Sequence, residues 1–441
     1  MSLLIPEIAA RIRRGLEEGV HPGDLLELLH RLDDSEKESL LALLYDGEVA
    51  VLLQEMELFE QVSLFRLLHH PRAPAVLKAM ASDDAVDLLG ELPPKETAAL
   101  LPLIDEDTAR FSGLLKYPEE SAGGIMTTEY ISLPADLPVE EAIARLREIA
   151  PQAETIYYVF VVDAENRLTG VLSLRDLIAA PDGTPLKEIM RHSVISVSAA
   201  VDQEEVARVV AKYDLLAVPV TDESNHLLGI ITFDDIMDVL EQEATEDIYR
   251  LAGAGEVSGV ELMEAPAHQV AWHRTPWLLL SMLGGIMAGY IMSVYESTLE
   301  SILVLAFFVP VIMDMGGNVS TQSSTIFVRG LATGEIKGKD IWRFLFREVK
   351  VGLIMGVLFG LLVAVSALLW RGNPALGLVV GSSMIATVSL ATIIGTLVPM
   401  FFHRLKIDPA ITSGPLVTTI KDITGLLIYF WMATLFLDYL C

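Results

Sequence analysis

Five long apolar stretches between residues 274 and 441 constrain the fold of this chain more than any other feature. They are residues 277–295, 301–328, 351–370, 375–402 and 409–437. Each is near or above the roughly 20 residues that a helix needs to cross a hydrocarbon core of about 30 Å. The second stretch contains one charged residue, Asp314, the last contains Lys421 and Asp422, and the other three contain none. We therefore predict an all-α membrane domain of five spans.

Asp422 lies near the middle of the last stretch, directly after Lys421. An ionised side chain at that depth costs at least a few kcal/mol, so it normally faces a bundle interior or a water-filled ion pathway. Consecutive residues of a helix point about 100° apart, so Lys421 and Asp422 cannot both face one narrow pore. We assign Asp422 to an ion pathway, and we predict that Lys421 forms a structural ion pair with Asp314, which lies at similar depth in the second stretch.

The loops between the stretches differ in their content of basic residues, which short cytoplasmic loops retain. The loops after the second and fourth stretches hold Arg329, Lys337, Lys339, Arg343, Arg347, Lys350, Arg404 and Lys406, whereas the opposite loops hold only Arg371. We expect a multi-pass protein of the cell (inner) membrane, with the amino-terminal portion cytoplasmic and the carboxyl terminus external. The first residues, MSLLIPEIAARIRR, lack the long apolar core of a signal peptide, which agrees with this orientation.

Almost all of the negative charge precedes the membrane domain. Residues 274–441 contain 9 acidic and 11 basic residues, so 51 of the 60 acids and 20 of the 31 bases lie in residues 1–273. Such a surface attracts cations and repels nucleic acid, which argues against a nucleic-acid partner. The plainer interpretation is a solvated surface that aids solubility. The single cysteine, Cys441, excludes an internal disulfide framework and a thiolate metal cluster.

Residues 1–120 repeat short amphipathic units in which paired leucines recur at helical spacing, as in DLLELLHRL and ESLLALLYD. The pattern predicts a cytosolic α-solenoid, a stack of short helices whose repeats bury only their neighbours. Asp83 and Asp87 share one helical face at i, i+4. Acids at a helix start are also favoured by the helix dipole, which is the alternative to a functional cluster.

Residues 121–240 contain an internal duplication. The segment YYVFVVDAENRLTGVLSLRDL recurs 59 residues later as LAVPVTDESNHLLGIITFDDI, and this pattern of strand, turn, strand and helix resembles a tandem pair of α/β CBS domains. Members of that family often bind ATP or another adenine nucleotide, which implies the candidate residues Tyr158, Ser173, Arg175, Asp176, Thr232 and Asp235. The alternative is that Ser173 and Thr232 only cap helices.

A strongly acidic helix is predicted next, in the sequence FDDIMDVLEQEATEDIYRLAG. Like charges one turn apart destabilise a helix, and a divalent cation would relieve that repulsion. Carboxylates suit hard cations such as Mg2+ or Ca2+, and the chain offers no Cys/His cluster for a softer metal. The alternative is a linker helix whose acids are merely solvated.

The order of these parts resembles the MgtE family of magnesium channels over essentially the whole chain. The stretches VPVIMDMGGNVSTQSSTIFVRG and DPAITSGPLVTTIKDITGLLIYF resemble that family as well. The resemblance implies a helical domain at 1–120, a CBS pair at 121–240, a connecting helix of plug type at 241–273 and a pore domain at 274–441. It also implies a homodimer in the lipid bilayer, not an enzyme, with a Mg2+ pore along the subunit interface.

The resemblance further implies which residues hold Mg2+. Asp422 matches the carboxylate of the pore, and Asp408 matches a regulatory carboxylate at the membrane side. The cytosolic acids that Mg2+ would bridge match Asp83, Asp87, Asp202, Glu204, Asp214, Asp235, Asp238, Glu243 and Glu246. At low Mg2+ these acids would repel one another and loosen the connecting helix, and bound Mg2+ would close the pore.

Polar and small residues on the second and fifth spans are candidates to line the pore, namely Asn318, Gln322, Thr418, Thr419 and Gly425. A pore can select Mg2+ by hydrogen-bonding its tightly held water molecules. Membrane helices also use such residues for packing, and this alternative stays open. The glycine run at Gly352, Gly356 and Gly360 is assigned to packing.

Two other classes of function stay open. A secondary transporter that exchanges Mg2+ or other divalent cations for Na+ or H+ would use the same carboxylate within the membrane. A membrane enzyme regulated by its CBS pair is disfavoured, because the chain contains no paired nucleophile and base, no phosphate-binding glycine loop and no His/Glu metal motif.

Overall fold

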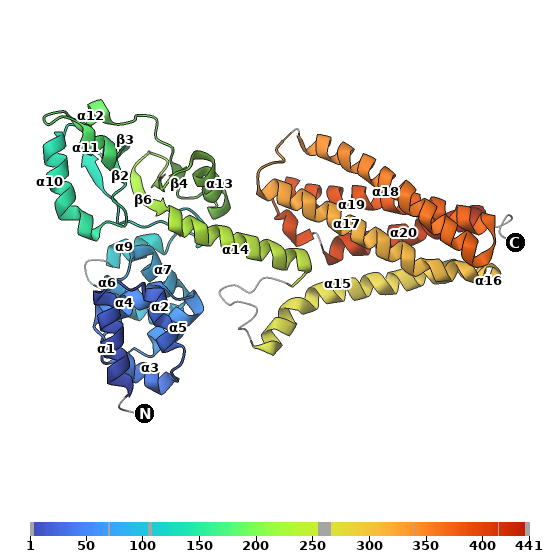
Figure 1. Ribbon diagram of the computed structural model, residues 1–441, viewed down its shortest axis with the longest axis horizontal. Coiled ribbons are helices and arrows are strands. Elements are labelled where there is room, and N and C mark those ends of the chain that lie inside the picture. Colours follow the sequence, from blue (N-terminus) through green and yellow to red (C-terminus); the bar gives the residue numbers. More distant parts are fainter. Residues whose placement is uncertain are drawn as a thin grey trace. The chain divides into compact units, whose positions relative to one another are not determined.

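The computed structural model describes residues 4–68, 71–104, 108–254, 266–338, 340–412 and 414–436. Cys441 and Lys339 lie outside the described residues. The chain forms two compact units, Met1–Glu241 and Gln242–Cys441. Figure 1 gives the order of the helices and strands along the chain.

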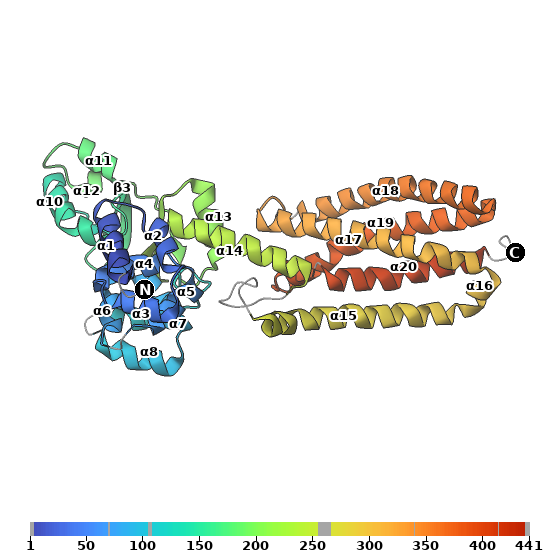
Figure 2. The ribbon, with the colours of Figure 1, turned by 60° about the horizontal axis from the view of Figure 1, so that its bottom comes forward.

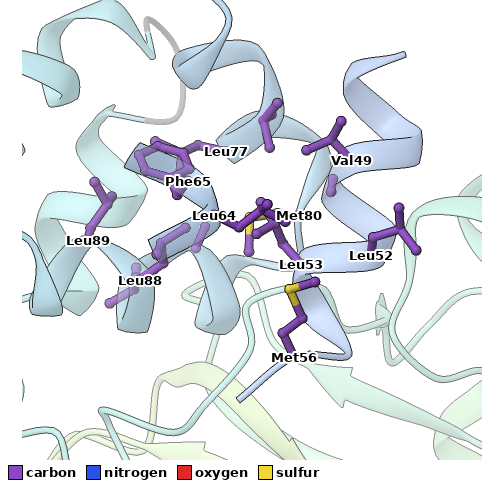
Figure 3. Packing of buried hydrophobic residues seen from close by; sticks show 14 of the residues in the cluster. Val49, Leu52, Leu53, Met56, Leu64, Phe65, Leu77, Met80, Leu88 and Leu89 are labelled. Carbon is purple, nitrogen blue, oxygen red and sulfur yellow. The ribbon is translucent and has the colours of Figure 1, made fainter. Parts of the chain in front are cut away.

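The first part of the amino-terminal unit is a stack of short helices, as predicted. The helices are α1 (Leu4–Glu17), α2 (Pro22–Leu29), α3 (Asp34–Leu41), α4 (Asp46–Gln54), α5 (Leu58–Arg66), α6 (Ala73–Ala79), α7 (Ser82–Glu91), α8 (Pro94–Leu100) and α9 (Thr108–Leu114). Helices two positions apart pack together, because α4 contacts α6 and α7 contacts both α5 and α9. The paired leucines fill the space between them, and Figure 3 shows Leu53, Phe65 and Leu88 within this buried cluster. This arrangement confirms the predicted α-solenoid.

The duplicated segment forms two sheets of three strands each. The strands are β1 (Ser132–Pro134), β2 (Tyr158–Val162), β3 (Leu168–Ser173), β4 (Val197–Ser198), β5 (Ala217–Thr221) and β6 (Leu227–Thr232). In each sheet the first strand pairs parallel with the middle strand, which pairs antiparallel with the third. Four helices accompany the sheets, namely α10 (Val139–Ile149), α11 (Leu174–Ala179), α12 (Leu186–Ile189) and α13 (Gln203–Tyr213). The two sheets confirm the duplication that the sequence predicted.

The two copies are joined reciprocally through their hairpin turns. The amide of Leu168 donates to the carbonyl of Asn225 over 2.9 Å, and the amide of Leu227 donates to the carbonyl of Asn166 over 3.0 Å. Both asparagines adopt the left-handed region, with φ of 61° at Asn166 and 65° at Asn225. Asparagine tolerates this region better than most residues, so the same residue at the same place in each repeat supports the pairing of the copies.

The acidic helix α14 (Phe233–Ala252) is one continuous helix that starts directly after β6. Gly253 ends it with φ of 66°, a conformation that glycine adopts readily at a helix end. The sequence placed the connecting helix at 241–273, whereas α14 already begins at Phe233 and α15 begins at Ala267.

Among the described residues of the second unit, five helices are long and apolar enough to span a membrane, which confirms the predicted number. These segments are Ala267–Val294, Leu303–Ala332, Asp340–Arg371, Pro374–Arg404 and Pro415–Leu435. They correspond to α15 (Ala267–Val294), η4 with α17 (Leu303–Phe308 and Val309–Ala332), α18 (Asp340–Arg371), α19 (Pro374–Arg404) and α20 (Pro415–Leu435), with α16 (Glu296–Ser301) and η5 (Pro409–Thr412) between them. In Figure 2 the long helices of this unit run in roughly the same direction.

Helix α19 is the centre of the membrane unit and packs against α17, α18 and α20. The glycine run of α18 faces it closely. A Cβ atom at Gly356 would lie 2.9 Å from the carbonyl oxygen of Ile385, and one at Gly360 would lie 2.7 Å from that of Gly381. Only glycine permits this approach of the two backbones, so the assignment of the run to packing is confirmed.

Candidate functional site

Helix α20 places Lys421 and Asp422 side by side in the membrane unit. Only 1% of the Lys421 side chain is exposed, against 23% of Asp422, and Lys421 Nζ lies 2.5 Å from Asp422 Oδ1. Lys421 also donates a hydrogen bond to the backbone carbonyl of Met313 in α17. The predicted ion pair between Lys421 and Asp314 is therefore wrong. The Cβ atoms of neighbouring helical residues do diverge, but the four-carbon stem of lysine lets its ammonium group reach back to the adjacent carboxylate.

Two glycines of α17 make room for this lysine. A Cβ atom at Gly316 would lie 2.6 Å from Lys421 Cδ, and one at Gly317 would lie 3.5 Å from Lys421 Nζ. Any larger residue at Gly316 would displace the lysine stem. The position of the ammonium group is thus set by packing between α17 and α20.

The three predicted pore-lining residues of α20 do not converge on one face of that helix. Thr418 faces Gly317 of α17, whereas Thr419 lies against Gly284 of α15 and Gly425 against Thr387 of α19. Asn318 and Gln322 lie on α17 and are exposed in the described structure. They belong to a row of exposed polar residues that recur at helical spacing along α17. We call this row the polar stripe of α17; its members are Asp314, Asn318, Gln322, Thr325 and Arg329.

Glu348 of α18 is a buried carboxylate that the sequence analysis missed. Its exposed fraction is 3%, and Ser323 of α17 donates a hydrogen bond to it over 2.8 Å. In the sequence it lies between Arg347 and Lys350 and reads as part of a basic cytoplasmic loop. Its spacing could have revealed it, because Glu348 lies one turn before Gly352 on the face that packs against α19.

The last turns of α14 lie against the segment that precedes α20. Arg250 forms ion pairs with Glu246 of its own helix and with Asp408, which also accepts a hydrogen bond from the amide of Ala410 over 2.8 Å. The structure thus brings together two of the predicted metal residues, Glu246 and Asp408, around one arginine. We call Glu246, Asp247, Arg250 and Asp408 the α14–η5 cluster.

Asp247 belongs to this cluster although it was absent from the predicted metal residues. Burial, together with the nearby charges of Asp408 and Glu243, raises the pKa of Asp247 to about 6. The predicted residue Glu243 therefore also lies within electrostatic reach. The sequence did not reveal Asp247, because the direction of its side chain depends on how α14 packs.

A second acidic cluster forms where α7 meets the CBS pair, within the amino-terminal unit. Ser82 at the start of α7 lies 3.3 Å from the hydroxyl of Thr127 and 3.1 Å from that of Thr128, which follow α9 in the chain. This contact holds the acidic start of α7 near carboxylates of the CBS domains. We call these residues the α7–CBS cluster, which comprises Asp83, Asp84, Asp87, Glu119, Glu129, Glu154 and Asp235.

The carboxylates of the α7–CBS cluster disfavour one another's ionisation. Burial raises the pKa of Asp83 well above its usual range, and Asp84 and Asp235 raise it further. Burial also raises the pKa of Asp87 to about 7 and that of Glu154 to about 7, with Asp235 among the repelling charges for both. The predicted residues Asp83, Asp87 and Asp235 are thus brought together, and repulsion among buried acids is what a bound cation would relieve.

Asp83 contributes the observation that best fits a cation. Its Oδ1 atom is buried without a hydrogen-bond partner among the described residues. Within those residues, no three Asp, Glu, His or Cys side chains are arranged to hold a metal ion. Carboxylate oxygens are the ligands that Mg2+ prefers, so the acids of the α7–CBS cluster are chemically suited to this ion. For one ion to be bound by several of them, the carboxylates must approach one another.

The other predicted metal residues lie apart from these clusters or at their edge. Asp202 and Asp214 lie at opposite ends of α13, where Asp202 accepts the amide of Glu204 over 2.9 Å and Asp214 ends the helix with φ of 51°. Glu204 forms an ion pair with Arg208. Asp238 lies on α14, and burial raises its pKa, followed by the charge of Glu241.

A cavity of about 550 Å³ opens beside the first CBS copy. Its lining residues are Tyr157, Tyr158, Ser173, Leu174, Arg175, Ile178, Ala179 and Leu216. Three predicted nucleotide residues, Tyr158, Ser173 and Arg175, are among them. Aromatic, hydroxyl and guanidinium groups in the lining of a cavity are suited to a base and a phosphate.

The remaining nucleotide candidates, Asp176, Thr232 and Asp235, form hydrogen bonds at the starts of α11 and α14. Ser173 donates its hydroxyl hydrogen to Asp176 over 2.7 Å, and this bond lowers the pKa of Asp176. In the second copy, the amide of Thr232 donates to Asp235 over 3.0 Å. Neither Thr232 nor Asp235 lines the cavity, and Asp235 instead belongs to the α7–CBS cluster.

Comparison with known families gives matches to three models. Residues 309–432 match a model described as MgtE, divalent cation transporter, and residues 20–120 match the MgtE intracellular N domain. Residues 122–183 and 186–242 each match the CBS domain.

Named relatives cover most of the chain. The magnesium transporter MgtE of Thermus thermophilus is 43% identical over 97% of this chain and 95% of its own length. That of Bacillus subtilis is 42% identical over 74% of this chain and 71% of its own length. Among solved structures, the cytosolic domain of the Mg2+ channel MgtE in complex with ATP is 39% identical and covers 52% of this chain and 99% of that chain, with a TM-score of 0.48.

Proposed function

This chain belongs to the MgtE family of divalent cation transporters, and we propose that it is a Mg2+-selective channel for magnesium uptake that cytosolic Mg2+ closes. The family and its named relatives are transporters rather than enzymes. The observation that carries the proposal is Asp422, a partly exposed carboxylate in a membrane-spanning helix.

Asp422 is the site at which a cation would pause within the membrane. A carboxylate in a span is costly unless it serves an ion path or a polar partner. Mg2+ sheds its water reluctantly, so the pore would attract the hydrated ion through Asp422 and contact its water through nearby oxygens. Thr418 of α20 and the exposed amides Asn318 and Gln322 of α17 supply such oxygens.

The polar stripe of α17 supports a homodimer. Its exposed Asp314, Asn318 and Gln322 would be costly against lipid, so they are better placed against water or a second subunit. In the dimer that we propose, two such stripes face one water-filled path along the subunit interface. The amino-terminal unit then lies in the cytoplasm and the carboxyl terminus outside, as the basic loops favour.

Closure would come from the acidic clusters. Buried acids with raised pKa values repel when ionised, and a divalent cation would draw them together. Mg2+ would thereby stabilise the arrangement in which its ligands are close, which we assign to the closed pore. Asp235 and Asp238 occupy the first turns of α14 and Glu246 its last turns, so the same helix carries acids of both clusters.

The cavity beside the first CBS copy is where we place an adenine nucleotide. Tyr158 and Leu216 offer apolar contact for a base, and Arg175 and Ser173 offer polar contact for phosphate or ribose. A nucleotide there would lie in the same unit as the α7–CBS cluster and would modulate it.

Single-channel recording tests the proposal. Patches are recorded with Mg2+ as the charge carrier while cytosolic Mg2+ is raised from nominally zero to millimolar. We expect openings that vanish as Mg2+ rises, and conduction that is lost in Asp422→Asn and kept in the control Glu300→Gln, an exposed acid of α16 outside the polar stripe. Mg2+ flux without unitary currents, and dependent on a Na+ or H+ gradient, would instead establish a coupled transporter.

A further inference from the structure

The exposed face of α18 changes its chemistry along the helix. Its first three turns expose a mixture of basic and aromatic side chains, namely Trp342, Arg343, Phe346, Arg347 and Lys350. From Leu353 to Leu369 the exposed side chains are apolar except Ser366, whose hydroxyl donates to the carbonyl of Leu362. One continuous surface of the helix therefore passes from a basic aromatic part to a part suited to lipid chains.

The length of α18 places this change at the level of the lipid headgroups. The helix has 32 residues, which is about 48 Å at 1.5 Å per residue, whereas a hydrocarbon core is about 30 Å thick. The distance along the helix from Lys350 to Arg371 is about 32 Å, which matches that core. The turns that carry Trp342, Arg343 and Arg347 therefore extend beyond the hydrocarbon into the polar headgroup layer.

The end of α19 adds a base at the same level. The two helices pack against each other, and the guanidinium carbon of Arg404 lies 5.4 Å from the centre of the Trp342 ring. On α18 itself, the guanidinium carbon of Arg347 lies 5.1 Å from the centre of the Phe344 ring. Such cation–π contacts orient a guanidinium group without using its N–H donors. We call Trp342, Arg343, Phe346, Arg347, Lys350 and Arg404 the α18–α19 basic face.

The bases of this face have no carboxylate partner within the part of the chain that the structure describes. None of Arg343, Arg347, Lys350 and Arg404 forms an ion pair there. The acids of the same helix do not compensate them, because Glu348 is buried with Ser323 and Asp340 lies at the first residue of α18. Four exposed positive charges beside aromatic rings at the headgroup level are suited to an anionic headgroup.

We propose that the α18–α19 basic face binds an anionic phospholipid of the cytoplasmic leaflet. The lipid phosphate would accept hydrogen bonds from the bases, and the acyl chains would lie along the apolar surface that begins at Leu353. That apolar continuation favours a lipid over a soluble phosphate, which has no use for it. The inference goes beyond the proposed function, since lipid binding does not require ion conduction, and only the choice of leaflet follows from the orientation proposed above.

The test compares three full-length proteins by native mass spectrometry in detergent with added phosphatidylglycerol or phosphatidylcholine. Arg347→Gln/Arg404→Gln removes one base of the face from each helix. Lys337→Gln/Lys406→Gln removes the same charge from exposed sites of the same two loops outside the face. We expect the first variant to bind phosphatidylglycerol about tenfold more weakly than the wild type, and the second to match the wild type. Phosphatidylcholine, which has no net charge, should bind weakly to all three.

Several outcomes would overturn the inference. Equal losses of phosphatidylglycerol in the two variants would show that only the total charge of the cytoplasmic side matters, as expected if these bases merely set the orientation of the spans. Equal binding of the two lipids to the wild type would exclude charge recognition. Displacement of phosphatidylglycerol by excess inorganic phosphate would show a phosphate site without a role for the acyl chains.

The same spectra report the oligomeric state. A change of oligomeric state in Arg347→Gln/Arg404→Gln alone would overturn the inference as well, because it would identify the face as a contact between copies of the chain. If this variant is not monodisperse, Arg343→Gln/Lys350→Gln, which removes the other two bases of the face, is judged by the same criteria. Absence of Mg2+ conduction in the wild type would contradict the proposed function and leave the lipid site intact.

Discussion

Ser323 of α17 donates its hydroxyl hydrogen to Glu348 of α18 over 2.8 Å, and both side chains are buried in the membrane unit. The pair joins α17 and α18, the two helices that the loop between the second and third spans connects. Glu348 also lies one turn before Gly352, where α18 approaches α19 closely. A polar link and a close backbone contact therefore meet at the same end of α18.

Ser323→Ala should destabilise the protein by about 1–3 kcal/mol, because the buried carboxylate of Glu348 loses a hydrogen-bond donor. Thermal or denaturant unfolding of the detergent-solubilised protein measures this change. Ser366→Ala on α18, where the serine is exposed and donates to the carbonyl of Leu362, is the matched control. Equal losses of stability in the two variants would show that the Ser323–Glu348 hydrogen bond contributes no more to stability than the exposed bond of Ser366.

Stability without Mg2+ should fall as pH rises from about 4 to about 7. In the unfolded chain these carboxyls titrate near pH 4, whereas the folded pKa values are about 7 for Asp87 and about 7 for Glu154. A raised folded pKa means that the folded state favours the protonated form. The stabilising contribution is therefore fully present below the unfolded pKa and is lost as pH rises through the folded values.

Melting temperatures across this pH range, with and without Mg2+, test the pH dependence. Asp87→Asn should flatten the Mg2+-free profile and reduce the stabilisation that Mg2+ gives at pH 8. Glu223→Gln, at an exposed acid of the CBS pair, should leave both unchanged. A profile of Asp87→Asn that overlays the wild type would contradict the cluster's role.

Neutralising the acids of α14 should weaken closure by Mg2+. The variant Asp235→Asn/Asp238→Asn/Glu246→Gln is expected to raise the Mg2+ concentration for half-closure several-fold, since each acid is a candidate bridge between the helix and its surroundings. Asp176→Asn is the control, because Asp176 is the counterpart of Asp235 in the first copy but caps α11 outside the cluster. An unchanged inhibition curve for the triple variant would refute the gating proposal.

Arg175→Ala should weaken binding of ATP about tenfold or more, as expected when a charged hydrogen bond to phosphate is lost. Binding is measured by calorimetry on the purified protein at fixed Mg2+. Arg167→Ala, at the hairpin turn of the same CBS copy and outside the cavity lining, is the comparison. Equal affinity in the two variants would place the nucleotide elsewhere.

The positions of the predicted acids show where sequence reasoning was sufficient and where it was not. The i, i+4 spacing correctly placed Asp83 and Asp87 on one helix, α7. Their neighbours Asp235 and Glu154 come from segments far along the chain, and the contact that unites them depends on how α7 packs against the CBS domains. The prediction for Lys421 failed for the same kind of reason, because helical geometry alone gave the direction of Cβ and not that of a long side chain.

The sequence by itself determined the five spans, the duplicated sheets and the candidate Asp422, because apolar length, strand alternation and a charge within a span are local properties of the chain. Only the tertiary structure decided that Lys421 pairs with Asp422, that Glu348 is buried against Ser323, and that Arg250 joins Glu246 to Asp408. Those pairings depend on which faces of separate helices meet, and that is set by the packing of the whole unit rather than by the spacing within any one helix.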